Sequence, residues 1–178
     1  MIVFHVAITA ADDYRTRREP HRRAHLERME GFRAAGAVIG GGPAPDGRTA
    51  DVVYRLQRPD QITPVIEEDP YRVNGVWTRW VPRSFTEFVE PWELPPLVLD
   101  GSRPATVIEG PVADRDMAQF ALIEMRGAGR LAFGGLFEDG ETWALVRTTD
   151  AAAAIGWFSE TGFWTAERLR CRPLLHVL

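Results

Sequence analysis

Two side chains in the first half of the chain have the chemistry to move a proton, and each lies near the end of an expected helix. His25 is near the start of a helix expected over residues 20–35, on the face that also carries Met29 and Phe32. A helix amino terminus disfavours positive charge, which keeps an imidazole available as a proton acceptor. Asp69 ends a second expected helix, where its carboxylate opposes the helix dipole and needs a compensating partner. Together they predict a His/Asp dyad for general acid–base chemistry.

Both residues also have structural interpretations. An Asp that precedes a proline, as Asp69 does, is a common cap for the following turn, and a lone His on an apolar helix face is often a packed residue. His21 and His25 are four residues apart and could both face a metal, with Glu68 or Asp69 as a third ligand. We expect neither a metal nor another cofactor, and these alternatives stay open at this point.

The helices and strands that must position the dyad can be predicted from the spacing of apolar residues and from the glycines and prolines that end each element. We expect strands over residues 2–8, 36–41, 49–57 and 75–90, and helices over 20–35 and 59–68. Gly36 ends the first helix, and Pro70 forces the second to end near residue 69. The resulting order is βαββαβ, that of a ferredoxin-like unit.

The second half repeats the first. Gly36-Ala-Val-Ile-Gly-Gly-Gly42 returns 93 residues later as Gly129-Arg-Leu-Ala-Phe-Gly-Gly135, and the same offset lays Asp46 on Asp139. Strands are expected over 104–109, 130–135, 142–149 and 165–178, and helices over 114–127 and 150–158. A repeat of this length indicates duplication of a small domain.

We therefore predict an α+β protein of two tandem ferredoxin-like units, residues 1–92 and 93–178, joined by the proline-rich connector 91–96. Helices cover only one face of such a sheet, so the other face must be buried. Two sheets packed face to face would form an intramolecular version of a dimeric α/β barrel.

The second copy lacks the residues of the dyad. His25 falls on Ala118 and His21 on Asp114, while Asp69 falls on Gly162 or, with a one-residue slip, on Thr161. The second unit is interpreted as a degenerate partner that closes the barrel.

Composition narrows the function classes. The chain contains no lysine, which excludes Schiff-base chemistry by the protein. The net charge is −4 and the arginines form no stripe, so nucleic acid is not expected as a partner. No apolar run is long enough for a membrane span, no targeting segment is expected, and the lone Cys171 fits a reducing compartment. We expect a cytoplasmic monomer or homodimer acting on a small molecule.

The motifs around the dyad resemble those of the YciI-like (YCII-related) family. Arg22-Arg-Ala-His25-Leu26 is similar to its Arg-x-x-His-Leu, Gly42-Pro-Ala-Pro45 to its Gly-Pro-x-Pro, and Asp69-Pro-Tyr71 followed by Gly75-Val-Trp77 to its Asp-Pro-Tyr and Gly-Val-Tyr. The resemblance covers residues 1–90. It implies a ferredoxin-like fold, a dimeric α/β barrel and an active site at His25 and Asp69.

These observations lead to a functional hypothesis. His25 would act as general base or acid, Asp69 would orient it, and Arg22 or Tyr71 would hold an anionic or phenolic oxygen of a small aromatic or enolisable substrate. His5 and Trp77 are further candidates for contacts with the substrate, with core packing as the alternative for His5. Dehydration, dehydrohalogenation and isomerisation all fit. The alternatives are a non-catalytic binding module and a cofactor-free oxygenase of the same barrel superfamily.

Overall fold

The computed structural model describes residues 1–178, and its contacts divide the chain into two compact units. The first unit comprises Met1–Ser84, Pro95–Leu99 and His176–Leu178, and the second comprises Phe85–Leu94 and Asp100–Leu175. The boundary expected near residue 93 lies inside the connector. The division seen in the structure differs from the expected one, because it assigns residues 85–92 to the second unit and residues 95–99 and 176–178 to the first.

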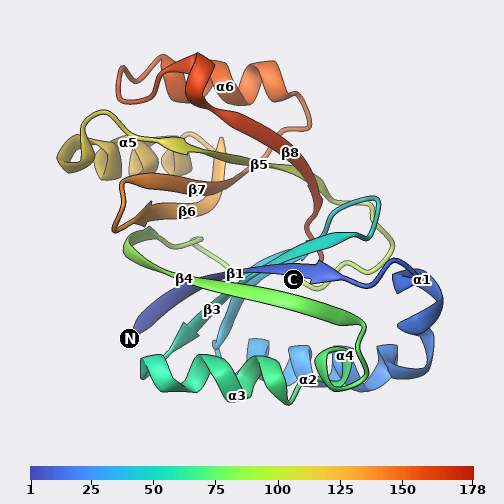
Figure 1. Cartoon of the computed structure of the whole chain (residues 1–178). Helices are drawn as coiled ribbons and strands as arrows, with labels where there is room; N and C mark the ends of the chain where they lie inside the picture. The colour runs from blue at the N-terminus through green and yellow to red at the C-terminus, as the bar shows by residue number, and fades with distance from the viewer. The chain divides into compact units, whose positions relative to one another are not determined.

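The first unit is a four-stranded antiparallel sheet with helices on one face (Figure 1). Its strands are β1 (Ile2–Ala10), β2 (Val38–Pro43), β3 (Thr49–Leu56) and the first part of β4 (Trp77–Val89), in the order β2-β3-β1-β4. Its helical segments are α1 (Tyr14–Arg17), η1 (Glu19–His21), α2 (Arg22–Ala34), η2 (Pro59–Gln61), α3 (Ile62–Glu67) and α4 (Pro70–Val73). In Figure 1, α2, α3 and α4 lie together below this sheet.

The second unit has the same order of elements. Its strands are β5 (Pro104–Pro111), β6 (Leu131–Phe137), β7 (Glu141–Val146) and β8 (Arg170–Leu175), in the antiparallel order β6-β7-β5-β8, and the last part of β4 pairs with β6. Its helical segments are α5 (Arg115–Gly127), α6 (Ala151–Ser159) and η3 (Ala166–Arg168).

The duplicated glycine motif lies at the same place in both units, where a helix ends and the next strand begins. α2 and α5 each contain 13 residues and are followed by glycines with positive φ, 69° at Gly36 and 75° at Gly129. A residue with a Cβ rarely adopts this left-handed conformation, so glycine ends each helix and turns the chain into the next strand.

Three details differ from the expected elements. The loop before residue 19 contains the helix α1, which Arg17 supports through a 2.8 Å ion pair with Asp13 four residues earlier. The helix expected over 59–68 is divided into η2 and α3. The strand expected over 165–178 is limited to β8, because η3 occupies its beginning and residues 176–178 leave the strand. No helix is both long and apolar enough to cross a bilayer.

The core of the first unit lies between its sheet and its helices. Phe4, Val6 and Ile8 of β1 pack there with Met29 of α2 and with Tyr71 and Trp77. Because successive strand residues point to opposite faces, His5 points to the face of β1 away from these helices. This alternation decides which candidate residues can meet.

Candidate active site

His25 and Asp69 are in direct contact. The His25 Nδ1 atom lies 2.9 Å from Oδ1 and 3.1 Å from Oδ2 of Asp69. The side chain of His25 is 12 % exposed and that of Asp69 is 1 % exposed. The contact joins α2 to the junction between α3 and α4, and Figure 1 shows these elements on the same face of the sheet. The expected proximity of the two side chains is therefore present in the structure.

Asp69 also caps α4, so the structural interpretation of this residue holds alongside the dyad. Its Oδ1 accepts a 2.8 Å hydrogen bond from the backbone N–H of Tyr71. A backbone N–H can only donate, which fixes an acceptor oxygen at this position. The turn thereby holds the carboxylate in place against His25.

Two aromatic rings fix the plane of the imidazole. The His25 ring stacks on Tyr71 with centroids 3.9 Å apart, and it meets Trp77 edge to face at 5.1 Å. A carboxylate beside Nδ1 favours the tautomer in which Nδ1 carries the proton and Nε2 keeps its lone pair. Nε2 is then the nitrogen left to exchange a proton with a substrate.

A small apolar pocket of about 50 Å³ lies beside His25. Its lining comes from the helices, the strands and the end of the described chain, and it consists of Tyr14, His25, Leu26, Met29, Gly42, Pro43, Ala50, Val52, Tyr71, Trp77, Val177 and Leu178. Three of the predicted site residues, His25, Tyr71 and Trp77, are thus in one pocket. The predicted contact residues Arg22 and His5 are not part of this lining.

A polar edge adjoins the aromatic wall. Arg18 Nη1 donates to the hydroxyl of Tyr14 at 3.3 Å, and the Tyr14 ring meets Tyr71 edge to face at 6.3 Å. Burial raises the pKa of the Tyr71 phenol well above its ordinary value, although the positive charges of Arg18 and Arg22 oppose the shift. Tyr71 therefore stays neutral and can donate a hydrogen bond. Arg22, half-buried, contributes charge at this edge.

Sequence reasoning missed Tyr14 and Arg18. They lie four residues apart in a polar stretch that shows no hydrophobic period. The only signal was the pairing of an aromatic and an arginine at helical spacing, which is weak without a predicted helix.

His5, a predicted substrate contact with core packing as the alternative, does not line this pocket. His5 lies 4 % exposed on the opposite face of β1, where its Nε2 is 2.6 Å from Oδ1 of Asp51. Asp51 is on β3, opposite Ala7 and therefore diagonal to His5 in the β1–β3 ladder. One feature of the sequence indicated this second His/Asp contact, which is a single Asp within the apolar residues of β3.

The metal hypothesis finds no geometric support. No group of three or more His, Cys, Asp or Glu side chains is placed to hold a metal ion. Glu68, one of the proposed third ligands, instead lies 3.4 Å from Nη2 of Arg28.

The second unit has a turn like the one at Asp69, but a neutral threonine stands in place of the carboxylate. The backbone N–H of Asp69 donates to the carbonyl of Ile66, and that of Thr161 donates to the carbonyl of Phe158. The hydroxyl of Thr161 accepts from the N–H of Phe163 two residues later, as Asp69 accepts from Tyr71. Thr161, rather than Gly162, is therefore the counterpart of Asp69. Ala118, the counterpart of His25, is completely buried.

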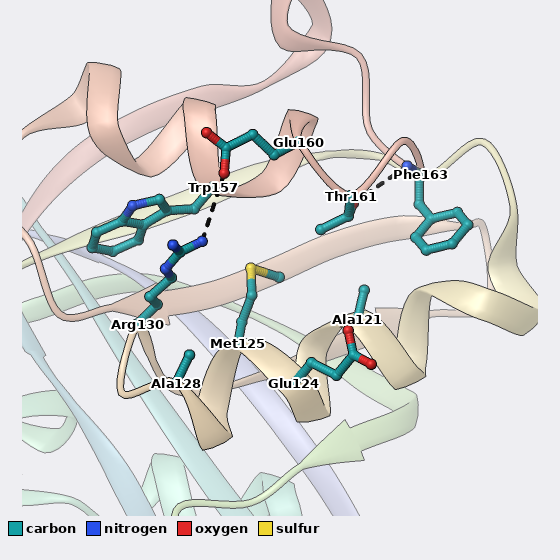
Figure 2. Close-up of a pocket in the computed structure, with 9 residues that line it drawn as sticks. All are labelled: Ala121, Glu124, Met125, Ala128, Arg130, Trp157, Glu160, Thr161 and Phe163. Atoms are coloured by element: carbon teal, nitrogen blue, oxygen red, sulfur yellow. Dashed lines mark hydrogen bonds and ion pairs between the residues drawn. The ribbon is translucent and has the colours of Figure 1, made fainter.

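A groove of about 390 Å³ lies between the two helices of the second unit (Figure 2). Met125 lies between the helices, with Trp157 and Arg130 at one end and Thr161 and Phe163 at the other. In the first unit the matching helix position to Ala121 is Arg28, whose side chain reaches across to the carbonyl of Val65. The short side chain of Ala121 does not reach across the groove that it lines.

Comparisons with known proteins find structures of similar fold, but they do not place the chain in a family. No protein-family model matches the chain, and no curated protein matches it by sequence. A candidate monooxygenase from Lactobacillus acidophilus NCFM superposes with a TM-score of 0.63 at 13% identity, covering 99% of this chain and 94% of its own. A candidate monooxygenase from Fusobacterium nucleatum subsp. nucleatum ATCC 25586 does so with a TM-score of 0.60 at 9% identity, covering 99% and 92%.

A third solved structure covers part of the chain. It is a 5-chloro-2-hydroxyhydroquinone dehydrochlorinase from Burkholderia phenoliruptrix AC1100, at 17% identity and a TM-score of 0.43, covering 48% of this chain and 94% of its own. That score supports no conclusion. The two whole-chain likenesses show the fold alone, a mixed α/β fold with antiparallel strands.

Proposed function

We propose that this chain is a small enzyme of the YciI-like kind that uses His25 and Asp69 for cofactor-independent proton transfer. The observation that carries the proposal is the contact of His25 Nδ1 with a buried carboxylate, at 2.9 Å, beside an apolar pocket. A dyad of this kind serves lyase, dehydrohalogenase or isomerase chemistry, in which a proton leaves one atom of the substrate and returns to another.

Each residue has a separate role in this proposal. Nε2 of His25 accepts the proton from the substrate, and Asp69 holds the Nδ1 proton and balances the imidazolium charge. The rings of Tyr71 and Trp77 favour a planar aromatic or enolisable substrate. The neutral phenol of Tyr71, with the charges of Arg18 and Arg22 nearby, suits a phenolic or enolic oxygen on which negative charge develops.

We also propose that the two units are tandem ferredoxin-like repeats whose sheets form an intramolecular barrel. The same order of strands and of the main helices in each unit supports this, together with the 93-residue repeat. The second unit would then be a degenerate partner, and the protein a pseudo-dimer that works in the cytoplasm as a monomer or homodimer.

The test is turnover of a panel of hydroxylated and halogenated hydroquinones by the full chain. His25→Ala should lower kcat/KM by about 10²-fold or more, as expected for loss of a general base. His21→Ala is the matched control, because His21 lies one helical turn earlier and outside the pocket. If His25→Ala retains nearly full activity with intact circular dichroism, the catalytic assignment is wrong. Binding of panel members without turnover by the unsubstituted protein would favour the binding module.

A further inference from the structure

Residues 176–178, which follow β8, contribute to the pocket beside His25. Val177 and Leu178 both line it. Leu178 is 5 % exposed and belongs to the same hydrophobic cluster as Met29 and Tyr71. A leucine buried to this degree occupies space that a ligand near His25 would otherwise use.

The glycine-rich end of β2 holds this segment. The backbone N–H groups of Val177 and Leu178 both donate to the carbonyl of Gly41, at 3.0 Å each, and the carbonyl of Val177 accepts from Val98 at 3.0 Å. Gly41 has a φ of +138°, and a Cβ at this position would approach the carbonyl oxygen of Asp51 to 2.1 Å. Only glycine fits the backbone conformation that presents this carbonyl.

The pocket as it stands is too small for an aromatic substrate. Its volume is about 50 Å³, whereas pockets for drug-sized ligands typically measure about 300–1,000 Å³. Most of its walls belong to β2, β3 and α2 and to the residues around α4, which the sheet and the core hold in place. Val177 and Leu178 lie outside any strand or helix, and backbone hydrogen bonds tie them to Gly41 and Val98.

We propose that Val177 and Leu178 form a gate over His25, and that their displacement from Gly41 opens the site to a ring-sized substrate. This inference rests on the proposed function. The size of the side chains at 177 and 178 then determines which ligands reach Nε2, so these residues act in specificity rather than in catalysis. The chemical class admitted is a single planar ring that takes the place of Leu178 in the hydrophobic cluster it shares with Tyr71 and Trp77.

The test measures access to His25 without any need for turnover. Diethyl pyrocarbonate acylates unprotonated imidazole nitrogens, and the rate at each histidine can be followed by mass spectrometry after tryptic digestion. Arginines place His21 and His25 on different tryptic peptides, 19–22 and 24–28, so His21 is an internal reference in every sample.

Leu178→Ala should raise the modification rate of His25 relative to His21 by about tenfold or more. In the wild-type protein only the minority of molecules with an open gate can react, whereas the variant lacks the side chain that closes it. Val177→Ala, which removes less volume, should raise it less. Leu56→Ala is the matched control, because Leu56 is 6 % exposed in the same core cluster but does not line the pocket.

The inference is overturned if Leu178→Ala leaves the rate ratio unchanged, or if Leu56→Ala raises it equally, which would indicate general loosening of the unit. These outcomes are separable from failure of the proposed function. A His25→Ala enzyme with full activity rejects the dyad whatever the modification rates, whereas an unchanged rate ratio rejects the gate and leaves the dyad in place.

Discussion

The imidazole of His25 and the phenol ring of Tyr71 are stacked face to face, with centroids 3.9 Å apart and planes inclined by 12°. Both residues are held by the same carboxylate, because Asp69 contacts Nδ1 of His25 and accepts the backbone N–H of Tyr71. One buried side chain thus sets the position of the imidazole and of the phenol ring stacked on it. Changes at Asp69 should therefore alter the state of His25 before they alter the fold.

Asp69→Asn should shift the tautomer equilibrium of His25 toward the form with the proton on Nε2. The N–H of Tyr71 requires an oxygen at the Oδ1 position, so the amide nitrogen of the asparagine takes the Oδ2 position, 3.1 Å from Nδ1, where it can donate to Nδ1. The oxygen that stays 2.9 Å from Nδ1 is neutral and accepts from Nδ1–H more weakly than a carboxylate does. Nitrogen-15 NMR of the imidazole should show Nδ1–H in the wild-type protein and a larger fraction of Nε2–H in the variant. The same tautomer in both would show that Asp69 does not orient His25.

Gly41→Ala should destabilise the protein by more than about 1 kcal/mol, because alanine must adopt a positive φ there and its Cβ collides with backbone. Gly31→Ala is the control within the same unit. Gly31 is exposed on α2 with no atom near its Cβ position, so alanine should stabilise by about 0.5–1 kcal/mol. Chemical denaturation measures both. Equal effects of the two substitutions would remove the argument that Gly41 is a special position.

Alkaline pH should unfold the protein through its buried tyrosines. Burial raises the pKa of the Tyr54 and Tyr71 phenols above their ordinary value of 10.0. The unfolded chain loses these protons near pH 10 and the folded chain does not, so stability is full below that pH and falls as the pH rises above it. The absence of lysine leaves this range free of ammonium titration.

Phenolate absorbance near 295 nm and far-ultraviolet circular dichroism should therefore change together for these two tyrosines. Tyr54→Phe should move the midpoint of alkaline unfolding to higher pH. Phenolate formation at both residues while the circular dichroism is still native would contradict the expectation.

The dyad could be predicted from the sequence because its two residues are placed by strong local signals, a helix start and an Asp-Pro helix end. The polar edge could not, because Tyr14 and Arg18 are the first residue and the C-cap of a one-turn helix with no amphipathic pattern. For His5 the choice between a substrate contact and core packing stayed open for a different reason. Alternation along β1 separates it from Phe4 and Val6, but both faces of the strand are buried, so the pattern does not show which face the helices cover.

The paired turns at Asp69 and Thr161 have an evolutionary consequence. Each side-chain oxygen accepts a backbone N–H two residues later, from Tyr71 and Phe163 respectively. Under the proposed duplication, a carboxylate at position 161 could be exchanged for a hydroxyl without the turn losing its hydrogen bond. Selection for a stable fold would not oppose that exchange, because the turn keeps its hydrogen bond. Only selection for the acid–base role of the carboxylate would oppose it. One repeat could drift into a purely architectural role while its sister remained under constraint.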